Sequence, residues 1–144
     1  MAREILFKAK RIDNGEWVEG LLSILNKGNI SDEGILETES VLAIQRPLFG
    51  MIEIDPNTIC QYTGLCDKNG NKIWENDVVR KTDTNPLGWR RVRECKVSFN
   101  KRGYWLLTTT YGDGYWICEF ESEQLEVIGN IFDNPELLGG ADNG

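Results

Sequence analysis

Turn-forming residues interrupt this chain at short intervals. Asp13-Asn14-Gly15 is a strong hairpin signal, because Asn and Gly tolerate the positive φ that tight turns require. Further turns are expected at residues 26–29, 62–72, 100–103 and 112–114. The segments between these turns are short and rich in β-branched and aromatic residues. This spacing predicts a mainly β protein with little helix, built from short strands.

Alternating polarity supports the strand assignment. Phe7 and Ala9 alternate with Lys8 and Lys10, which is the period of a half-buried strand. A helical turn is expected at the end, with Pro135 at its first position. Five short strands after residue 73 suit a small SH3-like or OB-like barrel. We expect an N-terminal β lobe over residues 1–62, a connecting turn over 63–72 and a C-terminal barrel with the helical turn over 73–144.

The chain contains no histidine among its 144 residues. It therefore lacks the base of a Ser-His or Cys-His couple and the imidazole ligands of zinc. No Cys-x-x-Cys pair is present, and no signal-peptide core precedes the four cysteines, so we expect four reduced thiols, mostly buried. The sequence predicts no metal site, no cofactor and no enzymatic activity. Hydrolysis by carboxylates alone, as in glycosidases, stays open.

No apolar run approaches the 18 residues of a membrane span, so we expect no membrane association and a cytoplasmic location.

Three segments resemble the YopX-like family of phage and prophage proteins. The central one begins at Gln61-Tyr62-Thr63-Gly64-Leu65, continues through Asp67-Lys68-Asn69-Gly70 and ends at Ile73-Trp74-Glu75-Asn76-Asp77-Val78-Val79. The closing segment contains Gly129-Asn130 and Pro135, and the opening one is Arg3-Glu4-Ile5-Leu6-Phe7-Lys8-Ala9. The resemblance implies a β-rich protein in two parts, a phage or prophage origin and a bacterial host cytoplasm. It assigns no catalytic residue.

The chain departs from the family pattern at two positions. Asn76 stands where the family usually has glycine, and Lys10 stands where an aromatic residue often follows Ala9. Asn tolerates a positive φ, so the turn before Asp77 can survive the first departure.

Two carboxylate groups in the central segment are candidate sites with structural alternatives. Asp67, Asn69 and Asn71 alternate like the start of a calcium loop, but Lys72 and Val78 occupy its diagnostic glycine and glutamate positions. A hairpin turn held by Asp67 is the favoured interpretation. Glu75 and Asp77 have the spacing of an acid–base or metal pair. With no nucleophile beside them, the favoured role of Asp77 is to accept backbone N–H bonds.

The net charge of −7 is the sum of three unequal segments. Residues 1–79 carry −5, residues 80–102 carry +6 and residues 103–144 carry −8. Basic residues and aromatic rings on a small barrel are typical of nucleic-acid binding. The candidate contacts for nucleic acid or a partner are Trp89, Arg90, Arg91, Arg93, Lys96, Lys101, Arg102 and Trp105.

The same bases can instead neutralise acids of this chain or of a second copy. The overall negative charge repels phosphate, which favours pairing within or between subunits over nucleic acid. Glu119, Glu121 and Glu123 would share one face of a strand and form an acidic face for a basic partner or a divalent cation, although a solvated face is commoner. We expect a self-associating accessory protein, with nucleic-acid binding or mimicry toward a host protein as alternatives.

Overall fold

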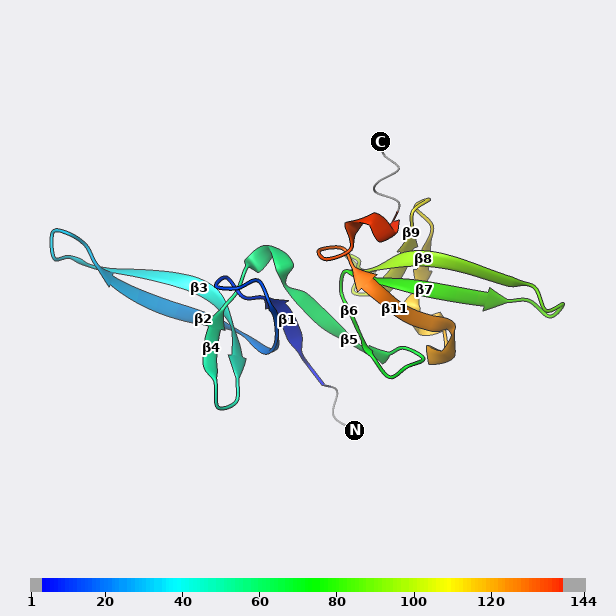
Figure 1. Ribbon diagram of the computed structural model, residues 1–144, viewed down its shortest axis with the longest axis horizontal. Coiled ribbons are helices and arrows are strands. Elements are labelled where there is room, and N and C mark those ends of the chain that lie inside the picture. The colour runs from blue at the N-terminus through cyan, green and yellow to red at the C-terminus, as the bar shows by residue number, and fades with distance from the viewer. Residues whose placement is uncertain (1–3, 139–144) are drawn as a thin grey trace. The chain divides into compact units, whose positions relative to one another are not determined.

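The computed structural model describes residues 4–138 of a mainly β chain (Figure 1). The predicted mainly β fold class is confirmed, because the strands form antiparallel ladders and each helical segment among the described residues is a short 3-10 turn. The chain divides into two compact units, Met1–Gln61 and Tyr62–Gly144.

The first unit is a meander of antiparallel strands. Its strands are β1 (Phe7–Lys10), β2 (Trp17–Ile30), β3 (Leu36–Arg46) and β4 (Gly50–Glu53), followed by the 3-10 turn η1 (Pro56–Thr58). The spatial order is β4-β3-β2-β1, and the start of β5 (Cys60–Cys66) pairs with β1. Its core is small. Ala9, Val18, Ile44 and Ile54 are buried at its centre.

A long hairpin extends from this unit, and it corrects one sequence prediction. The prediction of a turn at residues 26–29 is wrong, because these residues continue β2 and pair with β3. The pairing ends at Ile30, which lies opposite Leu36. The chain reverses later, at Ser31, whose side chain and carbonyl cap the turn, and Gly34, which has a φ of +80°. We call residues 25–41 the arm. No ladder in the described part of the chain joins either outer edge of the arm to a third strand.

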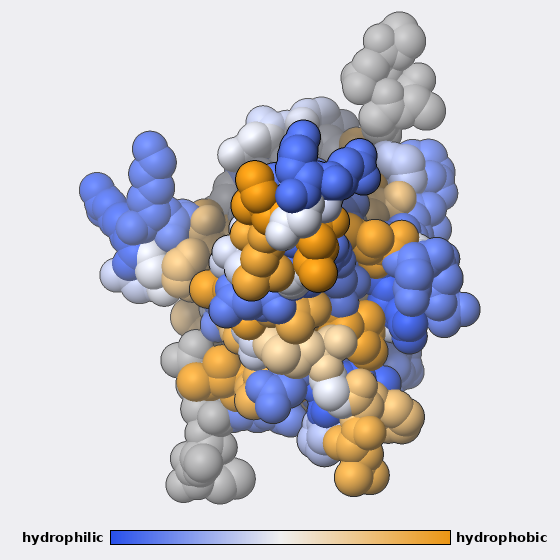
Figure 2. Space-filling model, turned by 90° about the vertical axis from the view of Figure 1, so that its left-hand side faces the viewer, coloured by the Kyte–Doolittle hydropathy of each residue, from blue (hydrophilic) through white to orange (hydrophobic). Residues whose placement is uncertain are grey.

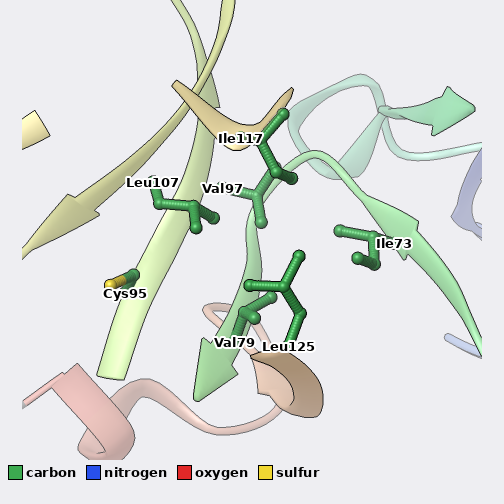
Figure 3. Packing of buried hydrophobic residues seen from close by; sticks show 7 residues of the cluster. All are labelled: Ile73, Val79, Cys95, Val97, Leu107, Ile117 and Leu125. Carbon is green, nitrogen blue, oxygen red and sulfur yellow. The ribbon is translucent and has the colours of Figure 1, made fainter. Parts of the chain in front are cut away.

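The second unit contains a five-stranded sheet in the order β10-β9-β8-β7-β11. These strands are β7 (Asp77–Thr84), β8 (Arg90–Phe99), β9 (Trp105–Thr109), β10 (Gly114–Trp116) and β11 (Leu125–Asn130), and β5 pairs with β6 (Lys72–Trp74) beside them. Figure 3 shows the core, to which Ile73, Val79, Cys95, Val97, Leu107, Ile117 and Leu125 contribute. No β10–β11 ladder occurs among residues 4–138, and closure into an SH3-like or OB-like barrel stays a prediction.

One turn chemistry recurs between the strands. Asn85 and Asn100 each accept, through the side-chain oxygen, hydrogen bonds from the backbone N–H groups two and four residues later. The residue three positions later is in each case a glycine with positive φ. Asp67 makes the same pattern with Gly70. A side chain that satisfies two N–H groups stabilises the turn locally, so each turn fixes the register of its hairpin.

The segment after β10 corrects a second prediction. The strand expected to carry Glu119, Glu121 and Glu123 is absent, because these residues lie in the 3-10 turns η2 (Ile117–Glu119) and η3 (Ser122–Gln124) and at the cap between them. Gln124 and Glu121 form a reciprocal capping box, which favours a helical turn over an extended chain. The expected turn at Pro135 is present as η4 (Pro135–Leu138). No helix among residues 4–138 is long and apolar enough to cross a membrane.

Candidate interaction surfaces

Asp67 is a buried anchor between two parts of the second unit. One carboxylate oxygen accepts the N–H groups of Asn69 and Asn71 at 2.9 Å, and the other accepts that of Val127 at 2.8 Å. Desolvation opposes ionisation of Asp67, but these three donors outweigh it and hold the pKa of the carboxyl below its ordinary value. Both oxygens thus accept hydrogen bonds from backbone N–H groups. This is the turn role that the sequence favoured over a calcium loop.

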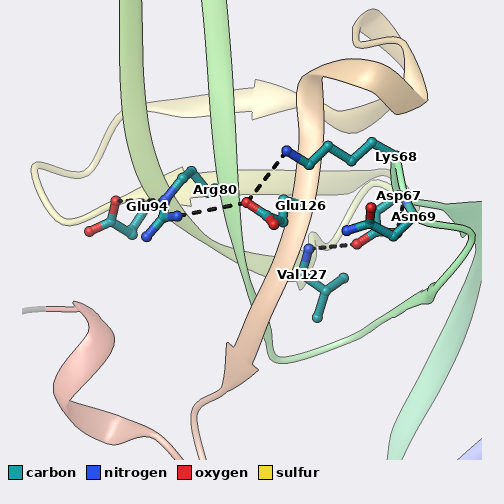
Figure 4. A network of polar contacts seen from close by, with 7 residues as sticks. All are labelled: Asp67, Lys68, Asn69, Arg80, Glu94, Glu126 and Val127. Carbon is teal, nitrogen blue, oxygen red and sulfur yellow. Dashed lines mark hydrogen bonds and ion pairs between the residues drawn. The ribbon is translucent and has the colours of Figure 1, made fainter.

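Exposed ion pairs surround this anchor (Figure 4). Glu126 lies 3.7 Å from both Lys68 and Arg80, and Arg80 also lies 3.9 Å from Glu94. All four side chains are partly solvated, so each pair contributes little to stability. The network joins β7, β8 and β11 at their surface. Arg80 therefore neutralises acids of its own unit.

Asp77 is buried and accepts the backbone N–H of Trp74 at 2.8 Å. Asn76 before it has a φ of +70°, so asparagine sustains the left-handed position as expected from the sequence. Glu75 is half-buried beside them. One carboxylate of the candidate pair is thus committed to the backbone, which favours a structural role for Asp77.

The candidate basic segment is divided among separate places. Arg91 and Arg93 share one face of β8, whereas Lys96 lies on the other. Lys101 and Arg102 lie in the turn after Phe99, about 30 Å from Arg90 at the rise of a strand. Trp105 packs against the core, and the centre of its ring lies 4.7 Å from the centre of the Phe99 ring. Trp89 remains exposed at 72%. The eight residues do not form one patch.

A groove of about 410 Å³ lies beside β8 and is lined there by Arg91, Val92, Arg93 and Glu94. Tyr111 lines its rim with 83% of its surface exposed, and the guanidinium of Arg93 lies 5.8 Å from this ring. Leu137 and Leu138 of η4 supply apolar atoms. Neither arginine pairs with an acid among residues 4–138. The lining thus combines two arginines with aromatic and apolar atoms and with one acid, Glu94, which lies 3.9 Å from Arg80. Sequence reasoning missed Leu137 and Leu138 as part of this site, because only the fold brings η4 beside β8 and β9.

A second depression, of about 490 Å³, lies at the end of β8. Trp89, Arg90 and Arg91 line it together with residues of β7 and the turn. Trp89 and the two arginines are therefore neighbours, as the candidate nucleic-acid site requires.

Lys81 belongs to the same basic stretch of sequence, but its side chain is buried. It pairs with Asp83, and its ammonium lies 4.3 Å from the ring centre of Tyr115 and 4.9 Å from that of Phe120. The stem of Lys81 fills the edge of the core between two rings. This base is therefore unavailable to a partner.

The arm ends in exposed apolar side chains. Ile30, Ile35 and Leu36 are 76%, 59% and 69% exposed, and Ile30 lies directly opposite Leu36. Figure 2 views the end from which the arm projects, where apolar and charged side chains lie next to one another. Between Lys27 and Arg46 the chain has no base and four acids, namely Asp32, Glu33, Glu37 and Glu39. The arm tip is thus apolar and acidic.

The predicted acidic strand face is wrong in its geometry. Glu119 ends η2, Glu121 caps η3 and Glu123 lies within η3, so these glutamates do not alternate along a strand. The capping box of Glu121 with Gln124 bends the chain there. All three are exposed, and their role toward a partner stays a prediction.

The four cysteines are free thiols. Cys60 and Cys95 are buried, Cys66 is half-buried and Cys118 is exposed. Burial raises the pKa of Cys95, although the nearby charge of Lys81 opposes this shift. Residues 4–138 also contain no cluster of three or more Cys, Asp or Glu side chains arranged to hold a metal ion.

Comparison with protein families decides the relationship of this chain. The family model described as YopX protein matches residues 6–139. The chain belongs to the YopX protein family. The crystal structure of protein EF1440 from Enterococcus faecalis is similar to it, with 23% sequence identity and a TM-score of 0.44, over 95% of this chain and 99% of that one. A comparison with curated proteins gives no match.

The residues that carried the YopX resemblance lie at turns and bulges. Three residues of β5, Thr63-Gly64-Leu65, stand opposite Ile73 alone, between the pairs Tyr62–Trp74 and Cys66–Lys72. Gly64 has a φ of +90°, and the Thr63 hydroxyl donates to the carbonyl of Ile73 at 2.7 Å. Gln61 precedes this bulge and pairs with Phe7 of β1. These motif residues shape the backbone.

The closing YopX motif has the same character. Gly129 lies beside a bulge in β11, and a Cβ there would come within 2.4 Å of the Asn134 side-chain oxygen. The Asn130 side chain accepts the N–H groups of Phe132 and Asp133, and Pro135 then begins η4. The motif turns the chain back and places η4 beside the groove.

Proposed function

We propose that this YopX protein is a non-enzymatic accessory protein of a phage or prophage, acting in the host cytoplasm as an interaction module that associates with itself. The YopX family is not a known enzyme family. The observation that carries the self-association is the arm. Three large aliphatic side chains at its tip are more than half exposed, and exposed apolar clusters of this kind mark interaction sites.

The stability of the arm supports the same proposal. A two-stranded ribbon without a third strand or a packed face is marginally stable in water. The arm has six residue pairs, from Leu25–Val41 to Ile30–Leu36, and none of these residues pairs with a third strand in the described part of the chain. Contact with a second molecule would bury its side chains and supply the missing stabilisation.

Sedimentation velocity of the full chain at low and high salt tests the self-association. We expect an assembly of two or more copies. Its population should depend on salt, because salt screens the exposed charges of the arm tip and of the arginines in the groove. A strict monomer at every concentration and salt would contradict the proposal.

Nucleic-acid binding is the second candidate function, and the depression at Trp89 favours it. An exposed indole beside Arg90 and Arg91 offers stacking and phosphate contacts in one place. In this case the change of Arg90, Arg91, Lys101 and Arg102 to Glu would abolish a salt-sensitive complex with DNA. No retention of single-stranded or duplex DNA by the unmodified protein at low salt would exclude it.

Mimicry toward a basic host protein through Glu119, Glu121 and Glu123 is supported less well. These exposed glutamates occupy two different 3-10 turns, so they present no regular row of charge. Capture of no basic partner from bacterial lysate would count against it.

A further inference from the structure

The tip of the arm and the groove over Arg91 and Arg93 have complementary chemistry. The tip offers Ile30, Ile35 and Leu36, with Asp32 and Glu33 in the turn between the strands. The groove offers the two arginines Arg91 and Arg93 together with an apolar lining, and its one acid, Glu94, is paired with Arg80. The two surfaces therefore carry opposite charges, and both have apolar side chains that could be buried in a contact.

The charges on the arm tip are available to a partner. Asp32, Glu33 and Glu37 are exposed, and none of them forms an ion pair with another residue of the described chain. The only base on the arm, Lys27, is held 2.7 Å from Glu53 at the foot of the hairpin. The tip consequently carries an uncompensated negative charge.

The groove has room and contacts for such a tip. Its volume of about 410 Å³ is in the range of pockets that enclose a small ligand, so it takes the end of a hairpin and not its full length. Leu137, Leu138 and the exposed Val92 present apolar atoms to the aliphatic side chains. Arg91 and Arg93 also line the groove, and their guanidinium groups can pair with carboxylates.

We propose that the acidic, apolar arm tip of one copy of this chain binds in the basic groove of a second copy. This inference rests on the proposed self-association and names the two surfaces that make it. A second copy supplies an apolar and acidic hairpin, whereas a nucleic acid would leave the leucines without a partner and would face a chain with a net charge of −7. The contact is heterologous, so it builds a closed ring or an open chain of copies.

Charge reversal with mixing tests the pairing. The arm variant carries Asp32→Lys and Glu33→Lys, and the groove variant carries Arg91→Glu and Arg93→Glu. We expect each variant alone to lose at least tenfold in association constant by sedimentation velocity. We expect their equimolar mixture to recover assembly, since the reversed arm fits the reversed groove. The matched control, Glu16→Lys with Glu19→Lys, changes two other exposed acids and should assemble like the unmodified chain.

The outcomes separate this inference from the proposal beneath it. Assembly of the unmodified chain that neither variant weakens would overturn the arm–groove contact and retain self-association. Loss in both variants without recovery on mixing would also overturn the contact. A monomeric unmodified chain would overturn both. Circular dichroism and thermal unfolding of each variant verify that the folded state is kept, and Ile35→Asp provides a second variant in which the apolar part of the tip is removed.

Discussion

The Asp67 carboxylate accepts a hydrogen bond from the backbone N–H of Val127 at 2.8 Å, across 60 residues of sequence. The same side chain also closes its own turn through Asn69 and Asn71. A local turn and a distant strand thus share one buried acid. This makes Asp67 the residue at which the central and closing YopX motifs meet.

Replacement of Asp67 by Asn should destabilise the chain by about 3 kcal/mol at pH 7. The amide can keep one accepting oxygen, but its NH₂ group would face the donor of Val127 and leave a buried N–H unpaired. Urea unfolding measures the loss. Asp113→Asn, at an exposed turn, is the matched control and should stay within about 0.5 kcal/mol of the unmodified protein.

The same substitution predicts a pH dependence. The folded-state pKa of Asp67 is lowered, so its stabilising contribution is present above the ordinary aspartate value near 4 and is lost as pH falls through the lowered value. The gap in unfolding free energy between the unmodified chain and Asp67→Asn should therefore narrow between about pH 5 and pH 2. A gap that stays constant over this range would show that the ionised carboxylate is not what the backbone requires.

Replacement of Gly129 by Ala should cost about 2 kcal/mol. The added Cβ would come within 2.4 Å of the Asn134 side-chain oxygen and 2.8 Å of Leu137, so η4 must shift. Gly114→Ala is the control, because no atom lies within 4 Å of its added Cβ. Thermal unfolding should separate the two variants by several degrees. Equal melting temperatures would contradict the close packing of η4 against β11.

Two substitutions of Lys81 distinguish whether its ammonium group or its aliphatic chain contributes more to the stability of the second unit. Lys81→Ala removes the chain between the rings of Tyr115 and Phe120 and should cost about 3 kcal/mol. Lys81→Met keeps the length of the side chain, and Asp83 is exposed enough to recover water, so this variant should lose less than about 1 kcal/mol. Denaturant unfolding of both variants measures the difference. Equal losses of unfolding free energy in the two variants would show that the charge of Lys81, and not its aliphatic chain, stabilises the protein.

Thiol labelling should distinguish the four cysteines. At pH 8 an alkylating reagent should modify Cys118 first, because this thiol is exposed, and Cys95 last, because burial both shields it and raises its pKa. Mass spectrometry of peptides after timed labelling measures the order, and Cys118→Ser should remove the fast phase. Rapid labelling of Cys95 in the folded chain would contradict its position in the core.

Sequence patterns predicted the features that depend on a few neighbouring residues. Asn14-Gly15 marked a real hairpin between β1 and β2, and the turn of Asp67 with Gly70 was recognised from the same chemistry. In both cases the side chains that satisfy the backbone lie within the turn itself. The mainly β character of the chain followed from such local signals.

The features that the sequence did not predict depend on residues far apart. Asn26 and Gly28 resemble a turn, but β3 offers ten partners to β2, and this longer ladder outweighs the local preference. Glu119 and Glu121 alternate as in a strand, yet the cap made by Gln124 bends the chain. The groove needs β8, β9 and η4 together, and no local pattern brings Leu137 beside Arg93.

The order of the strands has a consequence for synthesis on the ribosome. Strands β7 to β10 are joined by short turns, so each can pair with its predecessor as soon as it emerges. The ladder between β7 and β11 instead joins Asp77 to Asn130, and β11 is the last to be made of the strands among residues 4–138. Until then the outer edge of β7 lacks its partner strand, and the carboxylate of Asp67 lacks the N–H of Val127. Completion of the five-stranded sheet therefore waits for β11, and a nascent chain that stops before Leu125 leaves β7 as an open edge.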